Sequence, residues 1–188
     1  AKMNELLGNW IGTHPKARSN WQYTAVETLP QALQDADFVF ISIQPGSFEL
    51  MAHEIGVAEK YGMHFPVGDT TGVPGLMRGL RSAMTFAGFA REIAAHCPEA
   101  WVINYTNPMS ICTRTLTKVE PELKVFGCCH EVFGTQNILA ELAQSSLDLP
   151  HKPPRDQIRV NVLGINHFTW IDSANYKEID LLKLLRNH

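Results

Sequence analysis

The sequence predicts an α/β protein with a Rossmann-like, doubly wound parallel sheet. Short apolar runs at residues 37–43, 100–104 and 124–126 are typical of buried strands. Segments with a helical pattern separate these runs, and such alternation indicates parallel strands joined by crossover helices. The glycine fingerprint of dinucleotide-binding folds does not occur. Either the first strand and its glycine loop lie upstream of Ala1, or the protein is not a dinucleotide binder.

The first sixty residues contain three expected helices and two expected strands. Residues 2–7 form the tail of a helix that Gly8 closes, and residues 21–26 form a strand because aromatic and β-branched residues dominate them. Residues 29–35 are helical, with a proline in the first turn. The strand at 37–43 should be covered on both faces, and a helix at 48–61 follows it.

A glycine- and proline-rich stretch precedes the longest helix. Residues 62–79 are expected to be irregular, because glycine and proline recur from Phe65 to Gly75. Such a loop can bring its backbone close to a ligand, although a plain surface loop is the alternative. An amphipathic helix at 76–96 and the strand at 100–104 come next.

An Asn-Pro turn, Asn107-Pro108, follows the strand at 100–104 and places an amide at the carboxyl edge of the sheet. A helix at 109–118 and the strand at 124–126 continue the alternation. A further helix is expected at 137–143.

The last forty residues have a different pattern. A proline-rich connection at 148–157 leads into strands at 158–164 and 166–172 and a helix at 179–185. We therefore predict two domains: a partial Rossmann-like domain at 1–157, and the start of an α+β domain at 158–188.

Composition excludes several classes of protein. The 188 residues carry a net charge of −3, and no basic run suggests a nucleic-acid partner. No apolar stretch approaches the ~20 residues of a membrane span. The four cysteines are too few and too irregularly spaced for a disulfide scaffold, which favours a reducing, cytoplasmic setting.

Reactive side chains follow the strand at 124–126 without a gap. Cys128, Cys129, His130 and Glu131 bring thiols, an imidazole and a carboxylate to the carboxyl end of a strand, where open parallel sheets bind ligands. The alternative is that both cysteines are inert buried thiols.

A second polar cluster ends in His167, at the end of the strand at 158–164. Cys129 and His167 together could hold a divalent transition metal with positions left for substrate oxygens. His130 could act as a general acid, and Asn107 and Asn166 could bind sugar hydroxyls. A histidine in an apolar strand can equally be a satisfied core residue.

The segments together resemble glycoside hydrolase family 4, the NAD-dependent glycosidases. The matching segments fall in the family's order: residues 35–40, 68–75, 106–108, 127–132 and 164–167. This family is a known exception to the two-carboxylate scheme of glycosidases. The resemblance implies that NAD oxidises C3 of the sugar, that a divalent metal, usually manganese, helps to remove the C2 proton, and that elimination, water addition and re-reduction complete hydrolysis.

The resemblance also implies roles for individual residues. Cys129 and His167 match the metal ligands, His130 matches the proton donor, and Asn107 matches a substrate-binding asparagine. The strand end at Ile43, Gln44 and Pro45 should line the NAD. The resemblance thus implies that residues 1–157 are a partial NAD-binding domain and that residues 158–188 begin the substrate and catalytic domain.

The motif Cys129-His130-Glu131-Val132 resembles the α-galacturonidase group, with α-glucosidase as the second choice. An acidic substrate would need a cation, for which Arg78 and Arg81 are candidates, with a solvated helix face as the alternative. The family's tyrosine base is expected outside this chain, because Tyr176 follows His167 too soon. The fragment alone is therefore expected to be inactive.

Two other functions stay open. One is a lactate/malate-type, NAD-dependent 2-hydroxy acid dehydrogenase, which would need no metal, and the other is an inactive binding module. In each case the expected ligand is a small molecule, and exposed apolar surface makes a homo-oligomer the expected state.

Overall fold

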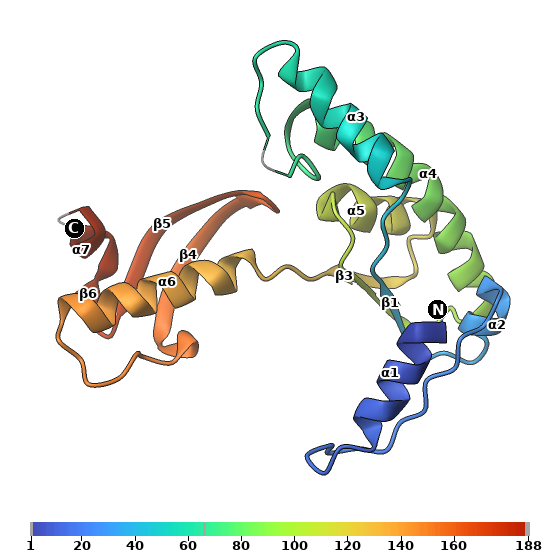
Figure 1. The fold of residues 1–188 in the computed structure, drawn as a ribbon, viewed down its shortest axis with the longest axis horizontal. Coiled ribbons are helices and arrows are strands. Elements are labelled where there is room, and N and C mark those ends of the chain that lie inside the picture. The colour runs from blue at the N-terminus through green and yellow to red at the C-terminus, as the bar shows by residue number, and fades with distance from the viewer. Residues whose placement is uncertain (1, 66, 187–188) are drawn as a thin grey trace.

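The computed structural model describes residues 2–65 and 67–186, which fall into two regions (Figure 1). We call residues 2–130 the parallel-sheet region and residues 131–186 the hairpin region. Figure 1 shows them joined by the short segment between β3 and α6. Pro66 of the predicted loop lies outside the described residues, as do Ala1 and residues 187–188 at the outer limits of the two predicted domains.

A three-stranded parallel sheet organises the first region. Its strands are β1 (Phe38–Ile41), β2 (Trp101–Asn104) and β3 (Lys124–Gly127), hydrogen-bonded in the order β1-β2-β3. The predicted α/β, Rossmann-like parallel sheet is therefore confirmed. Because the strands run in one direction, their carboxyl ends meet at one edge.

Helices and apolar side chains fill one face of this sheet. The helices of this part are α2 (Leu29–Leu33), α3 (Phe48–Glu59), α4 (Gly72–His96) and α5 (Met109–Val119). The core joins residues of α2, α4 and α5 to the sheet, including Leu33, Phe86, Ile93, Val102, Cys112 and Leu116. Helix α3 packs on α4.

The other face of the sheet differs from the expectation for residues 37–43. Phe38 and Phe40 are 60% and 64% exposed, and Trp101 and Phe126 beside them are also exposed. Alternate residues of a strand point to opposite faces. The described residues therefore cover only the face that carries Val39 and Ile41.

The amino-terminal segment contains two corrections. Helix α1 (Lys2–Gly12) runs past Gly8, where a Cβ atom would lie only 2.6 Å from the ring of Tyr23. The predicted strand at 21–26 is wrong: the backbone there pairs with side chains of α1 instead of with another strand. Asn9 exchanges two hydrogen bonds with the main chain of Tyr23, at 2.7 and 2.9 Å.

The hairpin region is α+β, as predicted for the second domain. Its elements are α6 (Glu131–Ser146), a 3-10 turn (Arg155–Gln157), β4 (Ile158–Ile165), β5 (Phe168–Tyr176), β6 (Ile179–Asp180) and α7 (Leu181–Arg186). The strands are antiparallel in the order β4-β5-β6. The predicted helix at 179–185 is thus a short strand followed by α7.

A second, separate core holds the hairpin region together. It joins α6, β4, β5 and α7 through Leu139, Ala140, Leu142, Ala143, Ile158, Ala174, Tyr176 and Leu181. Helix α6 belongs to this core, while the predicted domain division after residue 157 stays a prediction. In the part of the chain that the structure describes, no helix has the length and hydrophobicity that a membrane crossing requires.

Candidate metal and substrate site

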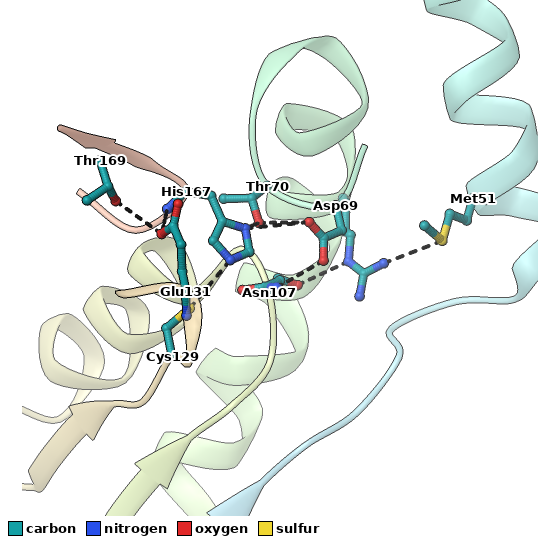
Figure 2. Close-up of polar contacts among 9 residues, drawn as sticks. Met51, Asp69, Thr70, Asn107, Cys129, Glu131, His167 and Thr169 are labelled. Atoms are coloured by element: carbon teal, nitrogen blue, oxygen red, sulfur yellow. Dashed lines mark hydrogen bonds and ion pairs between the residues drawn. The ribbon is translucent and has the colours of Figure 1, made fainter. Parts of the chain in front are cut away.

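The polar strand ends of both regions meet around one cavity of about 530 Å³. The loop before α4, the turns after β2 and β3, and the tip of the β4–β5 hairpin all contribute. Its lining includes Asp69, Thr70, Tyr105, Asn107, Cys129, His130 and His167. Figure 2 shows the side chains from these segments converging on the ring of His167.

Cys129 and His167, the predicted metal pair, lie together. The Sγ atom of Cys129 is 3.5 Å from Nε2 of His167. Metal bonds of about 2.0–2.3 Å to nitrogen and sulfur would give this separation at a roughly tetrahedral angle. The two atoms are therefore spaced as ligands of one ion.

Glu131 adds a carboxylate to this pair. Ligand atoms of Cys129, Glu131 and His167 all lie within 4.8 Å of one another, and all three residues are half-buried. A thiolate, an imidazole and a carboxylate suit a divalent transition metal, with further positions open to substrate. The donor set fits the manganese that the family resemblance implies.

The other nitrogen of His167 faces the loop before α4. Its Nδ1 atom lies 3.0 Å from the Thr70 hydroxyl and 3.8 Å from Oδ1 of Asp69 (Figure 2). The Thr70 hydroxyl also lies 3.0 Å from that Asp69 oxygen. Partners of this kind fix the tautomer and orientation of a ligating histidine. Gly75 permits the arrangement, because a Cβ there would lie 2.2 Å from the Thr70 carbonyl oxygen.

Asn107, the predicted substrate amide, joins the same network. Its Nδ2 donates to Oδ2 of Asp69 at 2.9 Å. The Asn107 carbonyl oxygen accepts from Nε of Arg78 at 3.0 Å, and Arg78 is only 5% exposed. Arg78 therefore supports the Asn107 turn from behind and is not a solvated surface residue.

His130 and Asn166 are placed differently. His130 is the N-cap residue of α6, and its exposed side chain lines the cavity. Asn166 is outside the lining residues, and its Oδ1 atom is buried without a hydrogen-bond partner among the described residues. The structure therefore places His130 at the cavity. Asn166, which precedes His167 in the turn between β4 and β5, does not line the cavity.

Ile43, Gln44 and Pro45, the predicted NAD contacts, follow β1 at the same sheet edge. The Ile43 N–H donates to the Thr106 hydroxyl at 3.0 Å, and the Pro45 carbonyl oxygen accepts from Arg81 at 2.8 Å. Ile43 lines a separate apolar cavity of about 310 Å³ along β1. Their contact with NAD stays a prediction.

Arg81 is committed to an internal partner. Its guanidinium forms a two-pronged ion pair with Glu54, which is 2% exposed. The hydrogen bonds to Glu54 raise the pKa of the Arg81 guanidinium. Because this charge is used within the protein, Arg81 is a poor candidate for binding an acidic substrate.

Cys128 affects the titration of Tyr105, its neighbour in the cavity wall. The charge of its thiolate, and then a hydrogen bond, raise the pKa of the Tyr105 hydroxyl. A tyrosine hydroxyl is protonated near neutral pH, and this shift extends the protonated state to higher pH, so Tyr105 can donate a hydrogen bond from the cavity wall.

Three site residues were missed as individuals by sequence reasoning: Asp69, Thr70 and Thr169. The first two lie in the predicted glycine-rich loop. The composition of this loop predicted that its backbone can come close to a ligand, but it did not predict which side chains point into the site. Thr169 follows the predicted His167 by two positions and shares its strand face only because of the turn.

Comparison with known proteins places these features in context. The family model described as "Family 4 glycosyl hydrolase" matches residues 2–145. An alpha-galacturonidase of Thermoanaerobacterium saccharolyticum is 51% identical over 179 residues, which is 95% of this chain and 38% of that protein. The chain thus spans about two fifths of the length of such relatives.

Solved structures agree. A Bacillus subtilis protein, lplD, described as a glucosidase, superposes with a TM-score of 0.90 at 52% identity, covering all of this chain and 42% of that chain. A 6-phospho-alpha-glucosidase from gut microorganisms, in complex with NAD and Mn²⁺, gives a TM-score of 0.70 at 22% identity, over 89% of this chain and 37% of that chain. At that identity the second likeness concerns the fold alone.

Proposed function

Because the chain belongs to family 4 of the glycosyl hydrolases, we propose that the full-length protein hydrolyses α-galacturonides with the help of NAD and a divalent metal. The observation that carries this proposal is the Cys129–Glu131–His167 group at the carboxyl edge of a Rossmann-like sheet. The sugar would bind in the cavity that Cys129, His130 and His167 line.

Cys129 and His167 would hold the metal, with the Glu131 carboxylate next to them. When bound, NAD supplies reversible oxidation at the sugar and the metal supplies polarisation of sugar oxygens. Asn107 would bind a sugar hydroxyl through the atoms that Asp69 leaves free. Its side-chain oxygen would accept a hydrogen bond from the sugar, while its Nδ2 atom donates to Asp69.

His130 would transfer a proton at the glycosidic oxygen. Its exposed ring on the cavity wall can reach a bound ligand, and an imidazole can both give and take a proton in general acid–base catalysis. The base that removes the C2 proton is expected from outside residues 2–186.

The choice of sugar rests on sequence likeness. The motif Cys129-His130-Glu131-Val132 resembles the α-galacturonidase group, and relatives at about 50% identity carry that name. We also propose that the protein is cytoplasmic and that its main binding partner is the small glycoside substrate.

We also expect a homo-oligomer. Leu76, Leu80 and Met84 recur every four residues on α4 and are 59%, 66% and 81% exposed. An apolar stripe of this kind supports association with another chain. The mass of the purified full-length protein in solution, by light scattering, tests this, and a monomer would contradict it.

The test is hydrolysis of p-nitrophenyl α-galacturonide by the full-length protein, with and without NAD and Mn²⁺. Wild type should need both additions, and Cys129→Ser should lose activity. Cys97→Ser is the matched control. Cys97 is buried in the core of the parallel-sheet region, away from the cavity, so this substitution should leave activity intact. Metal-independent NADH formation from a 2-hydroxy acid, without glycoside hydrolysis, would favour the dehydrogenase alternative.

A further inference from the structure

We propose that Glu131 is a positioning residue that fastens the tip of the β4–β5 hairpin to the start of α6 and so holds His167 against Cys129. The proposal rests on the metal site proposed above. It concerns contacts that exist within the protein before any ion binds.

The hairpin tip needs such a restraint. Asn166 and His167 form a two-residue turn between Ile165 and Phe168, and His167 has a φ of 58°. This left-handed conformation is unfavourable for a residue with a side chain. Ile165 and Phe168 beside the turn are 63% and 60% exposed, so apolar packing contributes little to holding it.

Glu131 supplies the contacts that packing does not. Its Oε2 atom accepts from the His167 N–H at 3.3 Å and from the Thr169 hydroxyl at 3.1 Å, one on each side of Phe168. The same hydroxyl lies 3.2 Å from the Ile165 carbonyl oxygen, so its single proton is shared between two acceptors that both join the hairpin tip. Figure 2 shows this carboxylate facing Thr169 and the backbone of His167. A charged acceptor makes these bonds stronger than neutral ones.

The same residue also contacts the other ligand. The Glu131 N–H lies 3.4 Å from Sγ of Cys129 and donates to it. Glu131 is the first residue of α6, where an acidic side chain is stabilised by the helix dipole. One residue therefore touches both Cys129 and His167, and sets their separation across the boundary between the two regions.

The position of Glu131 permits two roles: it can be a direct metal ligand, or it can hold the hairpin turn in place. Variants of Thr169 distinguish these two roles. The Thr169 hydroxyl donates to Glu131, and Thr169 is not one of the three candidate metal ligands Cys129, Glu131 and His167. If Glu131 fastens the turn, removing the Thr169 hydroxyl loosens His167. If Glu131 acts only as a ligand, removing that hydroxyl can alter metal affinity through the carboxylate, but exchange at the turn without metal keeps the wild-type rate.

The test uses the full-length protein with Glu131→Ala, Thr169→Val and Thr169→Ser. Two readouts apply: amide hydrogen exchange of residues 165–169 without metal, and Mn²⁺ affinity by calorimetry. Glu131→Ala and Thr169→Val should speed exchange at the turn, and Glu131→Ala should weaken Mn²⁺ binding by about 10- to 100-fold, as loss of outer contacts typically does. Thr169→Ser should restore both readouts to the wild-type values.

Glu141→Ala is the matched control, because Glu141 lies on the same helix but pairs with Lys152 at the surface. Wild-type exchange at the turn in both Glu131→Ala and Thr169→Val would overturn the proposal, whatever happens to metal affinity. Failure of wild type to bind Mn²⁺ would instead overturn the metal site, and the exchange data would still decide the fastening role.

Discussion

The two regions position their functional residues by different means. In the parallel-sheet region, Asn107 follows the central strand β2, which is paired on both sides, and the sheet register and a core packed on one face fix its location. In the hairpin region, His167 lies at the tip of two strands with exposed neighbours. Its N–H donates a hydrogen bond to the Glu131 carboxylate, and its ring shares a hydrogen bond with the Thr70 hydroxyl. Packing therefore determines one half of the site, and a few polar contacts determine the other.

Phe86→Ala should give the largest change in stability. Phe86 is fully buried at the centre of the parallel-sheet core, and removing a buried phenylalanine ring costs about 3–5 kcal/mol. Denaturant unfolding with hydrogen exchange should localise the loss to α4, α5 and the parallel strands. Equal loss of protection in α6 and β4 would show that the two cores unfold as one unit and break the comparison.

Leu181→Ala should give the next largest effect, in the opposite region. Leu181 is fully buried in the hairpin core. We expect a loss of about 3 kcal/mol, toward the lower part of the range for leucine, because a small core with exposed strands can relax into the cavity. Exchange should rise in α6, β4 and β5 and stay low in α4. A matching rise in α4 would contradict separate cores.

The parallel-sheet region should show a pH dependence of its stability. Burial raises the pKa of the Cys112 thiol to about 11, from an ordinary value of 9.0. Between these values the unfolded chain has released the proton and the folded chain has kept it, so stability falls as pH rises. At pH 10 the expected loss is roughly 1 kcal/mol relative to pH 7.

Urea unfolding at several pH values checks this, with Cys112→Ala as the reference. That variant should be less stable at pH 7 but should lack this part of the decline above pH 9. Parallel curves for the two proteins would show that Cys112 does not titrate as its burial implies.

The smallest effect is expected at the surface. Lys124 on β3 pairs with Glu99 at 2.7 Å, and both side chains are well exposed. Solvent screens such pairs, so Lys124→Ala should unfold at nearly the wild-type urea concentration, at low and at high salt. A loss comparable with that of Leu181→Ala would mean that this exposed sheet face is covered by other parts of the protein.

The sequence was informative where a periodic pattern or a motif stood at a strand end. The three parallel strands were predicted because each is a compact apolar run, and Cys129, His130 and Asn107 were predicted because they follow such runs. The structure places Cys129, His130 and Asn107 around one cavity, with His167 beside Cys129.

Other features depend on contacts that no local pattern encodes. Residues 21–26 have strand composition, but their partner is the side-chain face of α1. Helix α4 begins at Gly72, because Pro74 fits a first turn and Gly75 lets Thr70 approach. Helix α6 begins at Glu131 after His130, an N-cap residue without a side-chain cap bond, so the usual start signal is absent.

The most direct test of the central claim is Co²⁺ binding to the full-length protein, followed by the thiolate-to-cobalt charge-transfer band. If one ion lies between the two regions, wild type should show the band, Cys129→Ala should lose it, and His167→Ala should keep it with much weaker affinity. The expected weakening exceeds the about 10- to 100-fold typical of outer contacts. A band that survives in Cys129→Ala, or wild-type affinity in His167→Ala, would contradict a metal site shared by the two regions.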